Sequence, residues 1–89
     1  MSITLNIDES LFDHGEGKVV VEVSGNTVRE CLDYVVKRRP SLKKAIFDER
    51  GNIHYDNLVR VNEDYVSSDR LSKPVKDGDG IEIVKLTGG

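Results

Sequence analysis

The residues with the clearest chemical potential stand at the end of the chain, where the strand-like run Ile81–Leu86 is followed by Thr87 and the pair Gly88-Gly89. Glycine adds no side chain to a core and loses more conformational entropy on ordering than any other residue. Two glycines can, however, lie extended in a channel too narrow for a side chain, and they would present the carboxylate of Gly89 there as a reactive group. The alternative is a frayed, inert end.

The other residues that could do chemistry form no catalytic set. Cys31 is the only cysteine, and its place on the apolar stripe of a predicted helix makes it a small hydrophobic core residue. His14 and His54 fall in expected loops, without the i, i+4 spacing of a helical zinc pair. Gly17-Lys18 runs into a β-branched strand, so it is no phosphate loop. We therefore expect a protein that is not an enzyme and holds no metal.

Length and charge narrow the class further. The chain has 89 residues and a formal charge of −3, which predict one domain and disfavour an extended nucleic-acid footprint. The basic cluster Lys37–Lys44 is explained by a solvated helix end, with an acidic partner or RNA as the alternative. No apolar stretch approaches the roughly 20 residues needed to cross a bilayer. We expect a cytoplasmic protein that binds neither nucleic acid nor membrane.

Alternating apolar residues predict two N-terminal strands, at Ile3–Ile7 and Lys18–Gly25, joined as a hairpin through the turn-rich segment Asp8–Gly17. The inward positions would be Ile3, Leu5, Ile7, Val19, Val21 and Val23.

A helix follows, capped by Asn26 or Thr27, with Glu30 as the third helical residue if Thr27 is the cap. Pro40 prevents its continuation, and Ser41 can begin a second, shorter helical turn. The apolar stripe of the main helix comprises Val28, Cys31, Leu32, Val35 and Val36.

The second half of the chain predicts three more strands. In Asn57–Val66 one face is formed by Val59 and Val61 and the other by Leu58 and Arg60, before a turn into a short strand around Tyr65. Leu71 is the expected anchor of the polar connector, and Ile81–Leu86 is the last strand.

This order predicts an α+β fold, a β-grasp with a mixed four- to five-stranded sheet and one main helix packed across one face. The body would span residues 1–86, with 87–89 as a flexible tail. Glu82, Val84 and Leu86 would point to the face that the helix leaves open. Apolar residues there, beside the tail, indicate a docking patch.

Several of these features occur together in one known family. They are Thr27-Val28 at the helix start, Pro40 after the helix, the strand Val59–Val66, the turn and strand Asp77–Ile83, and the terminal Gly-Gly. In that order they resemble the MoaD/ThiS family of ubiquitin-like sulfur carriers, over about Ile3–Gly89. The segment Glu9–Lys18 looks more like the carriers of cysteine- or thiamine-type sulfur delivery than like those of the molybdopterin-synthase type.

The resemblance implies a mechanism. A ubiquitin-activating-type enzyme would use ATP and magnesium to adenylate the carboxylate of Gly89, and sulfur would then displace AMP to leave a thiocarboxylate. The carrier itself would bind no cofactor. Gly88 would pass the constriction beside the nucleotide, with Leu86 and Thr87 as the stem inserted in the partner's active site.

The resemblance also implies partners and contact residues. The activating enzyme would contact Val84, Leu58 and Arg60, and a sulfur-accepting enzyme would use the sulfur for cysteine, thiamine, molybdopterin or thiolated tRNA. The free protein would be a monomer. Three alternatives remain open: a modifier joined to lysines through Gly89, the small subunit of a molybdopterin-synthase-like complex, and an interaction module with an inert tail.

Overall fold

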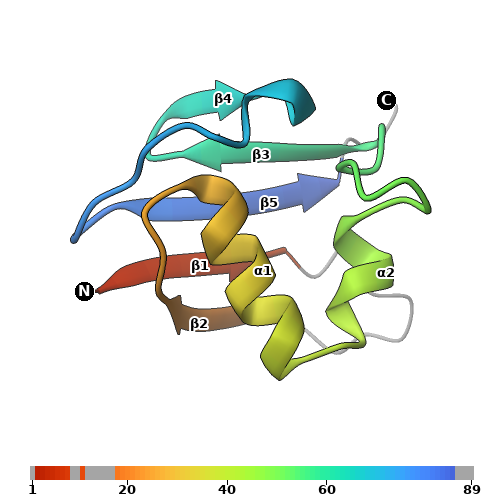
Figure 1. The fold of residues 1–89 in the computed structure, drawn as a ribbon, viewed down its shortest axis with the longest axis horizontal. Helices are drawn as coiled ribbons and strands as arrows, with labels where there is room; N and C mark the ends of the chain where they lie inside the picture. The colour runs from red at the N-terminus through yellow and green to blue at the C-terminus, as the bar shows by residue number, and fades with distance from the viewer. Residues whose placement is uncertain (1, 9–10, 12–17, 86–89) are drawn as a thin grey trace.

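Five strands form one mixed sheet in the order β2-β1-β5-β3-β4 (Figure 1). The computed structural model describes residues 2–8, 11 and 18–85. The strands are β1 (Ile3–Ile7), β2 (Val19–Val23), β3 (Asn57–Val61), β4 (Asp64–Val66) and β5 (Gly80–Lys85). The helices are α1 (Val28–Arg38), the short α2 (Leu42–Ile46) and the 3-10 turn η2 (Ser68–Arg70).

The strand pairing follows the predicted alternation. β1 pairs antiparallel with β2, which confirms the predicted pairing of the first two strands, and parallel with β5, where Leu5 lies beside Ile81. β5 also pairs antiparallel with β3, so the strand nearest the C-terminus lies in the middle of the sheet. Side chains at every second position face the helices, and Ile3, Leu5 and Ile7 are fully buried as predicted.

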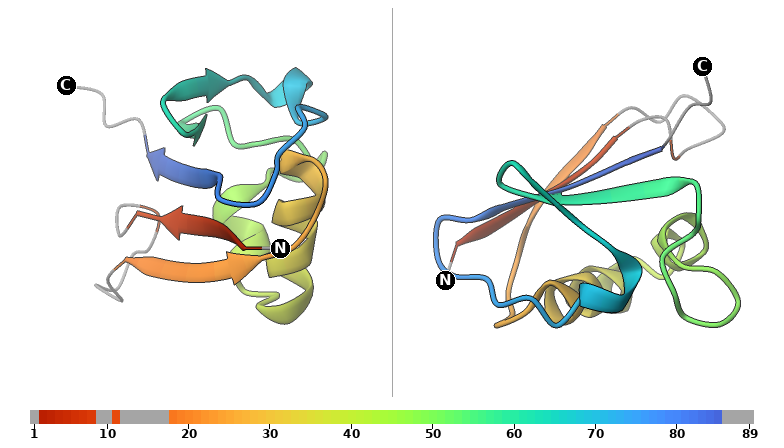
Figure 2. Two further views of the ribbon diagram at one scale, coloured as in Figure 1. Left: turned by 90° about the vertical axis from the view of Figure 1, so that its left-hand side faces the viewer. Right: turned by 90° about the horizontal axis from the view of Figure 1, so that it is seen from above.

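α1 lies across one face of this sheet (Figure 2). Its N-cap is Thr27, whose Oγ1 accepts a hydrogen bond from the backbone N–H of Glu30 at 3.2 Å. The Glu30 carboxylate accepts in turn from the backbone N–H of Asn26 at 3.0 Å. Thr27 is therefore the cap of the two that the sequence left open, and the helix ends at Arg38, ahead of Pro40.

The core lies between the sheet and the two helices. Four of the five predicted stripe residues of α1 are buried, and Val36 is partly buried against them. α2 adds Leu42 and Ile46. The connector between β4 and β5 adds Leu71, as predicted, and Val75, which the sequence analysis did not select.

Hydrogen bonds of Asn62 connect the turn between β3 and β4 to the start of β5. Asn62 begins the turn from β3 to β4 with a positive φ of 55°, a conformation that Asn tolerates better than most residues. Its side-chain oxygen accepts from the backbone N–H of Gly80 at 3.1 Å, and its own N–H donates to the Gly80 carbonyl at 2.7 Å. The start of β5 is thus tied to the β3–β4 turn.

The predicted α+β, β-grasp class is confirmed, with five strands in the sheet and one main helix. The last strand begins at Gly80 rather than at the predicted Ile81, because Gly80 already pairs with Thr4, and its predicted end at Leu86 lies outside the described residues. None of the helices described is long and apolar enough to cross a bilayer.

Candidate functional site

The predicted reactive end and its stem, Gly89, Gly88, Thr87 and Leu86, lie outside the described residues, as does His14. The predicted boundary between body and tail therefore stays a prediction. What the structure does describe is the point from which the end of the chain continues and the sheet face beside it.

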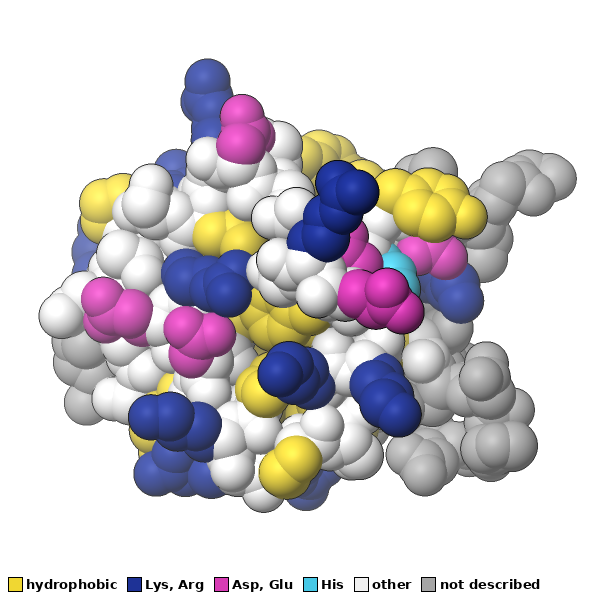
Figure 3. Space-filling view, turned by 45° about the vertical axis from the view of Figure 1, so that its right-hand side comes forward, with side chains coloured by type: hydrophobic (Ala, Val, Ile, Leu, Met, Phe, Trp, Pro, Cys, Tyr) yellow, Lys and Arg dark blue, Asp and Glu magenta, His cyan; other side chains and the backbone are white. Residues whose placement is uncertain are grey.

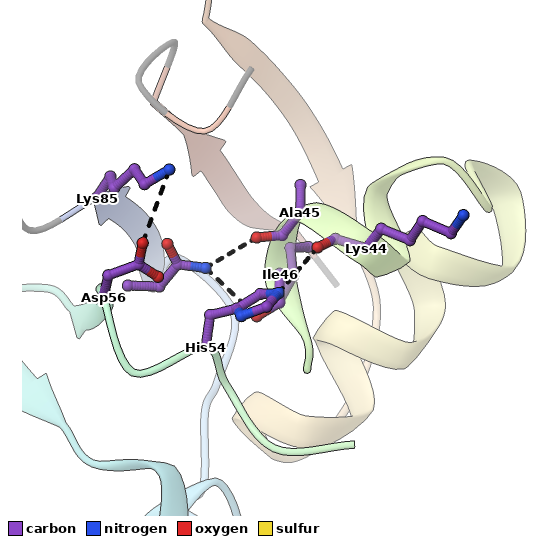
Figure 4. A network of polar contacts seen from close by, with 7 residues as sticks. Lys44, Ala45, Ile46, His54, Asp56 and Lys85 are labelled. Carbon is purple, nitrogen blue, oxygen red and sulfur yellow. Dashed lines mark hydrogen bonds and ion pairs between the residues drawn. The ribbon is translucent and has the colours of Figure 1, made fainter. Parts of the chain in front are cut away.

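That point is Lys85, the last residue of β5, which pairs with Asn57 at the start of β3. Its Nζ lies 3.7 Å from Oδ2 of Asp56, an ion pair that Figure 4 shows. Because β5 is paired on both sides by β1 and β3, the residue that precedes the predicted stem is held by the centre of the sheet.

Asn57 also connects this strand pair to α2, through hydrogen bonds to two of its backbone carbonyls. Its side chain is only 8% exposed, and Nδ2 donates to the carbonyls of Ala45 at 2.9 Å and Ile46 at 3.4 Å. The backbone N–H of His54 donates to the same Ile46 carbonyl at 3.1 Å, and its ring Nε2 lies 3.1 Å from the carbonyl oxygen of Lys44. The carbonyls at the end of α2, which have no partner within the helix, are thereby satisfied.

The sequence analysis missed Asn57. A signal was present in the sequence, because residues two apart in a strand share a face and Asn57 therefore lies on the same face as Val59 and Val61. A polar side chain on a buried face must find hydrogen-bond partners.

The face of the sheet turned away from α1 brings together the three predicted docking residues. Leu58 lies beside Val84 in the register of β3 and β5, and Arg60 lies beside Glu82. All four side chains are partly exposed. The apolar pair Leu58–Val84 is one position from Lys85, so the open face carries its apolar surface next to the predicted tail.

Charges occupy the middle of the same face. Arg60 and Glu82 form an ion pair, with side chains 40% and 37% exposed. The Nε atom of Arg60 is buried without a hydrogen-bond partner. An ion pair this exposed contributes little to stability, so its larger effect is to set a defined charge pattern on the surface that a partner would meet.

A hollow of about 580 Å³ opens beside Leu58, toward η2. Its rim includes two exposed aromatic residues, Tyr55 and Tyr65, which are 95% and 67% exposed, together with Arg70. The sequence analysis did not select this hollow, because it is formed where a loop and a short strand meet and has no periodic pattern of its own.

The remaining candidates behave as structural residues. Cys31 is fully buried in the core, as predicted, and its burial, with a smaller effect of the neighbouring Glu30 charge, raises the pKa of its thiol. A raised pKa disfavours the nucleophilic thiolate. Within the described part of the chain, no three His, Cys, Asp or Glu side chains are grouped to hold a metal ion.

Comparison with known families matches residues 5–89 to the ThiS family. With this match over nearly the whole sequence and the fold described above, the chain belongs to the ThiS family of ubiquitin-like β-grasp sulfur carriers and modifiers. A comparison with curated protein sequences finds no match.

Solved structures agree with this assignment. A chain of the BexX/CysO complex from Amycolatopsis orientalis is 34% identical, with a TM-score of 0.80 and 98% of each chain covered. CysO from Mycobacterium tuberculosis is 24% identical, with a TM-score of 0.79, covering 96% of this chain and 99% of that one. SAMP1 from Haloferax volcanii is also 24% identical, with a TM-score of 0.76, covering 100% of this chain and 99% of that one. The last two, at this identity, show the fold alone.

Proposed function

We propose that this protein is a cytoplasmic sulfur carrier that cycles between a carboxylate and a thiocarboxylate at Gly89. The observation that carries the proposal is the ThiS-family match, which extends to residue 89 and so includes the Gly88-Gly89 pair. It is supported by the described residues, among which the single thiol is buried and no metal-binding group is found. The protein's own chemistry would then be confined to its terminal carboxyl group.

The chemistry follows from the low reactivity of a carboxylate. In the proposed cycle, an activating enzyme binds ATP and magnesium, and the Gly89 carboxylate attacks the α-phosphorus with loss of pyrophosphate. The resulting acyl-adenylate has AMP as a good leaving group. Sulfide then attacks the carbonyl carbon and AMP departs, which leaves a thiocarboxylate for delivery to a biosynthetic enzyme. The carrier binds no cofactor of its own, and ATP and magnesium belong to its partner.

In this cycle the folded domain provides the surface that the activating enzyme binds. Leu58, Val84 and Arg60 would contact the activating enzyme, while Leu86, Thr87 and Gly88 enter its active site. The crystallised BexX/CysO pair supports a stable complex between a chain of this kind and a second protein. The pairing of Lys85 with Asn57 fixes the residue from which the predicted stem continues relative to the docking residues.

Mass spectrometry of the intact protein tests the proposal. After incubation with a ThiS-family activating enzyme from the same cell, ATP, magnesium and sulfide, we expect a mass gain of about 16 Da as one oxygen is replaced by sulfur. The gain should lie in the C-terminal peptide Leu86–Gly89 that trypsin releases after Lys85.

A chain that lacks Gly88 and Gly89 is the matched control, and it should gain no mass. If the full chain stays unmodified with every such enzyme of its own cell, the carrier proposal is wrong. If it is instead recovered in amide linkage to lysines, the chain is a protein modifier.

A further inference from the structure

Five exposed cations gather where α1 ends and α2 begins. We call them the basic ridge: Lys37, Arg38, Arg39, Lys43 and Lys44. The lower part of Figure 3, over the described residues, shows dark blue Lys and Arg side chains without magenta Asp or Glu side chains among them.

The ridge contrasts with the rest of the protein. The full sequence has 13 Lys and Arg against 16 Asp and Glu, and a net charge of −3. Five of the cations lie within the eight residues 37–44, which contain no acidic residue. The other eight therefore stand against all sixteen acidic residues, and the molecule is strongly polarised in charge.

None of the ridge cations takes part in an ion pair among the described residues. The ion pairs found among the described residues belong to Arg29, Arg60 and Lys85. Arg38 instead places its guanidinium 3.6 Å from the ring centre of Tyr34, a cation–π contact that leaves its N–H groups available at the edge. The ridge thus presents one oriented guanidinium and four further cations to the solvent.

The helix dipole explains only part of the ridge. Lys37 and Arg38 lie in the last turn of α1, where cations are favoured. Lys43 and Lys44 lie in the five-residue α2, within a turn of both its ends, so the dipole gives them no net stabilisation. Five like charges this close repel one another, and no ion pair among the described residues offsets that cost.

We propose that the basic ridge is a second docking surface, which binds an acidic surface on a protein partner. Charge complementarity carries this assignment, because desolvated Lys and Arg clusters need carboxylates opposite them. A protein fits better than RNA, since a nucleic acid would bring its repeated phosphates against a body that is otherwise strongly acidic.

The ridge lies in the helix layer, on the opposite side of the sheet from Leu58 and Val84 (Figure 2). A partner bound to the ridge would therefore leave the open face accessible to another protein. The proposal needs neither Gly89 nor sulfur, so it is independent of the sulfur-carrier function.

An NMR titration with a peptide of about ten glutamates tests the ridge. We expect saturable shifts of the backbone amides of residues 37–39 and 41–44 at about 50 mM NaCl, weakened at about 300 mM, without shifts at Leu58 or Val84. The double variant Lys43→Glu/Lys44→Glu should weaken binding at least tenfold. The matched control, Lys73→Glu/Lys76→Glu, changes the net charge equally beyond the other end of α1 and should change affinity by less than about twofold.

Three results would overturn the proposal. They are equal losses in the two double variants, no saturable shift at the lower salt concentration, and tighter binding of a single-stranded RNA of equal charge than of the peptide. In the first case the peptide senses only net charge, and in the last the ridge is a nucleic-acid surface. Circular dichroism of both variants, all at exposed positions, verifies that the fold is unchanged.

Discussion

At the scale of single residues, Gly25 shows how closely α1 approaches the chain that precedes it. A Cβ placed on Gly25 would lie 2.9 Å from the backbone nitrogen of Cys31 and 2.9 Å from Cβ of Glu30. Neither atom is the end of a flexible side chain, so neither can move away without shifting the first turn of the helix. Glycine is needed here for space rather than for backbone conformation.

Gly25→Ala should therefore lower the free energy of unfolding by about 1–3 kcal/mol, the usual cost of inserting a methyl group into a closely packed site. Urea unfolding followed by circular dichroism measures it. Gly80→Ala is the control, because nothing lies within 4 Å of its added Cβ, and we expect a change of less than about 0.5 kcal/mol. Equal effects at the two glycines would show that the contact at Gly25 relaxes freely.

At the scale of elements, the link between α2 and β3 depends on one buried amide. Asn57 donates to two carbonyls at the end of α2 and sits opposite Lys85. The same residue thus positions a helix and the strand from which the predicted stem continues.

Asn57→Ala should destabilise the protein by about 1–3 kcal/mol, because the carbonyl of Ala45 loses the Asn57 donor and that of Ile46 keeps only the backbone N–H of His54. Hydrogen exchange should accelerate most in α2 and at Lys85. Asn52→Ala removes an exposed amide from the neighbouring loop and should leave stability and exchange nearly unchanged. Unaltered exchange in α2 of Asn57→Ala would mean that the helix is held by Leu42 and Ile46 alone.

At the scale of the whole molecule, the two faces of the sheet have different roles. One face is covered by the helices and holds the core, while the other leaves Leu58 and Val84 beside the end of β5. If the activating enzyme binds that open face, replacing Leu58 and Val84 should lower the rate of thiocarboxylate formation and should change the stability of the fold little.

Leu58→Gln/Val84→Gln should lower kcat/KM for thiocarboxylate formation at least tenfold, or about 1.4 kcal/mol of transition-state binding. Val20→Gln is the matched control, since Val20 is 53% exposed on β2, at the far edge of the same face. The initial rate of the 16-Da product by mass spectrometry is the measurement. A loss of rate with Val20→Gln as large as with the double variant would indicate a general loss of surface hydrophobicity.

Much of this architecture follows from the sequence because its patterns are local. Alternation predicted the burial of Ile3, Leu5 and Ile7, and side-chain chemistry limited the cap to Asn26 or Thr27 and predicted the stop before Pro40. The same alternation predicted that Leu58, Arg60 and Val84 share a face, provided that β3 and β5 belong to one sheet.

The features that escaped prediction are contacts between distant segments. The parallel pairing of β1 with β5, the amide of Asn57 under α2 and the burial of Val75 each depend on how far-apart elements meet. Periodicity describes which side of an element is apolar, but it does not say which neighbour covers it.

The central place of β5 has a consequence for biosynthesis. This strand joins the β1–β2 pair to the β3–β4 pair, yet the ribosome makes it after the other four strands of the sheet. Until residues 80–85 leave the exit tunnel, the two halves of the sheet have no common strand and the core cannot close. A nascent chain therefore cannot complete its sheet before residues 80–85 emerge, and a product that terminates ahead of them would lack the strand that joins the two halves.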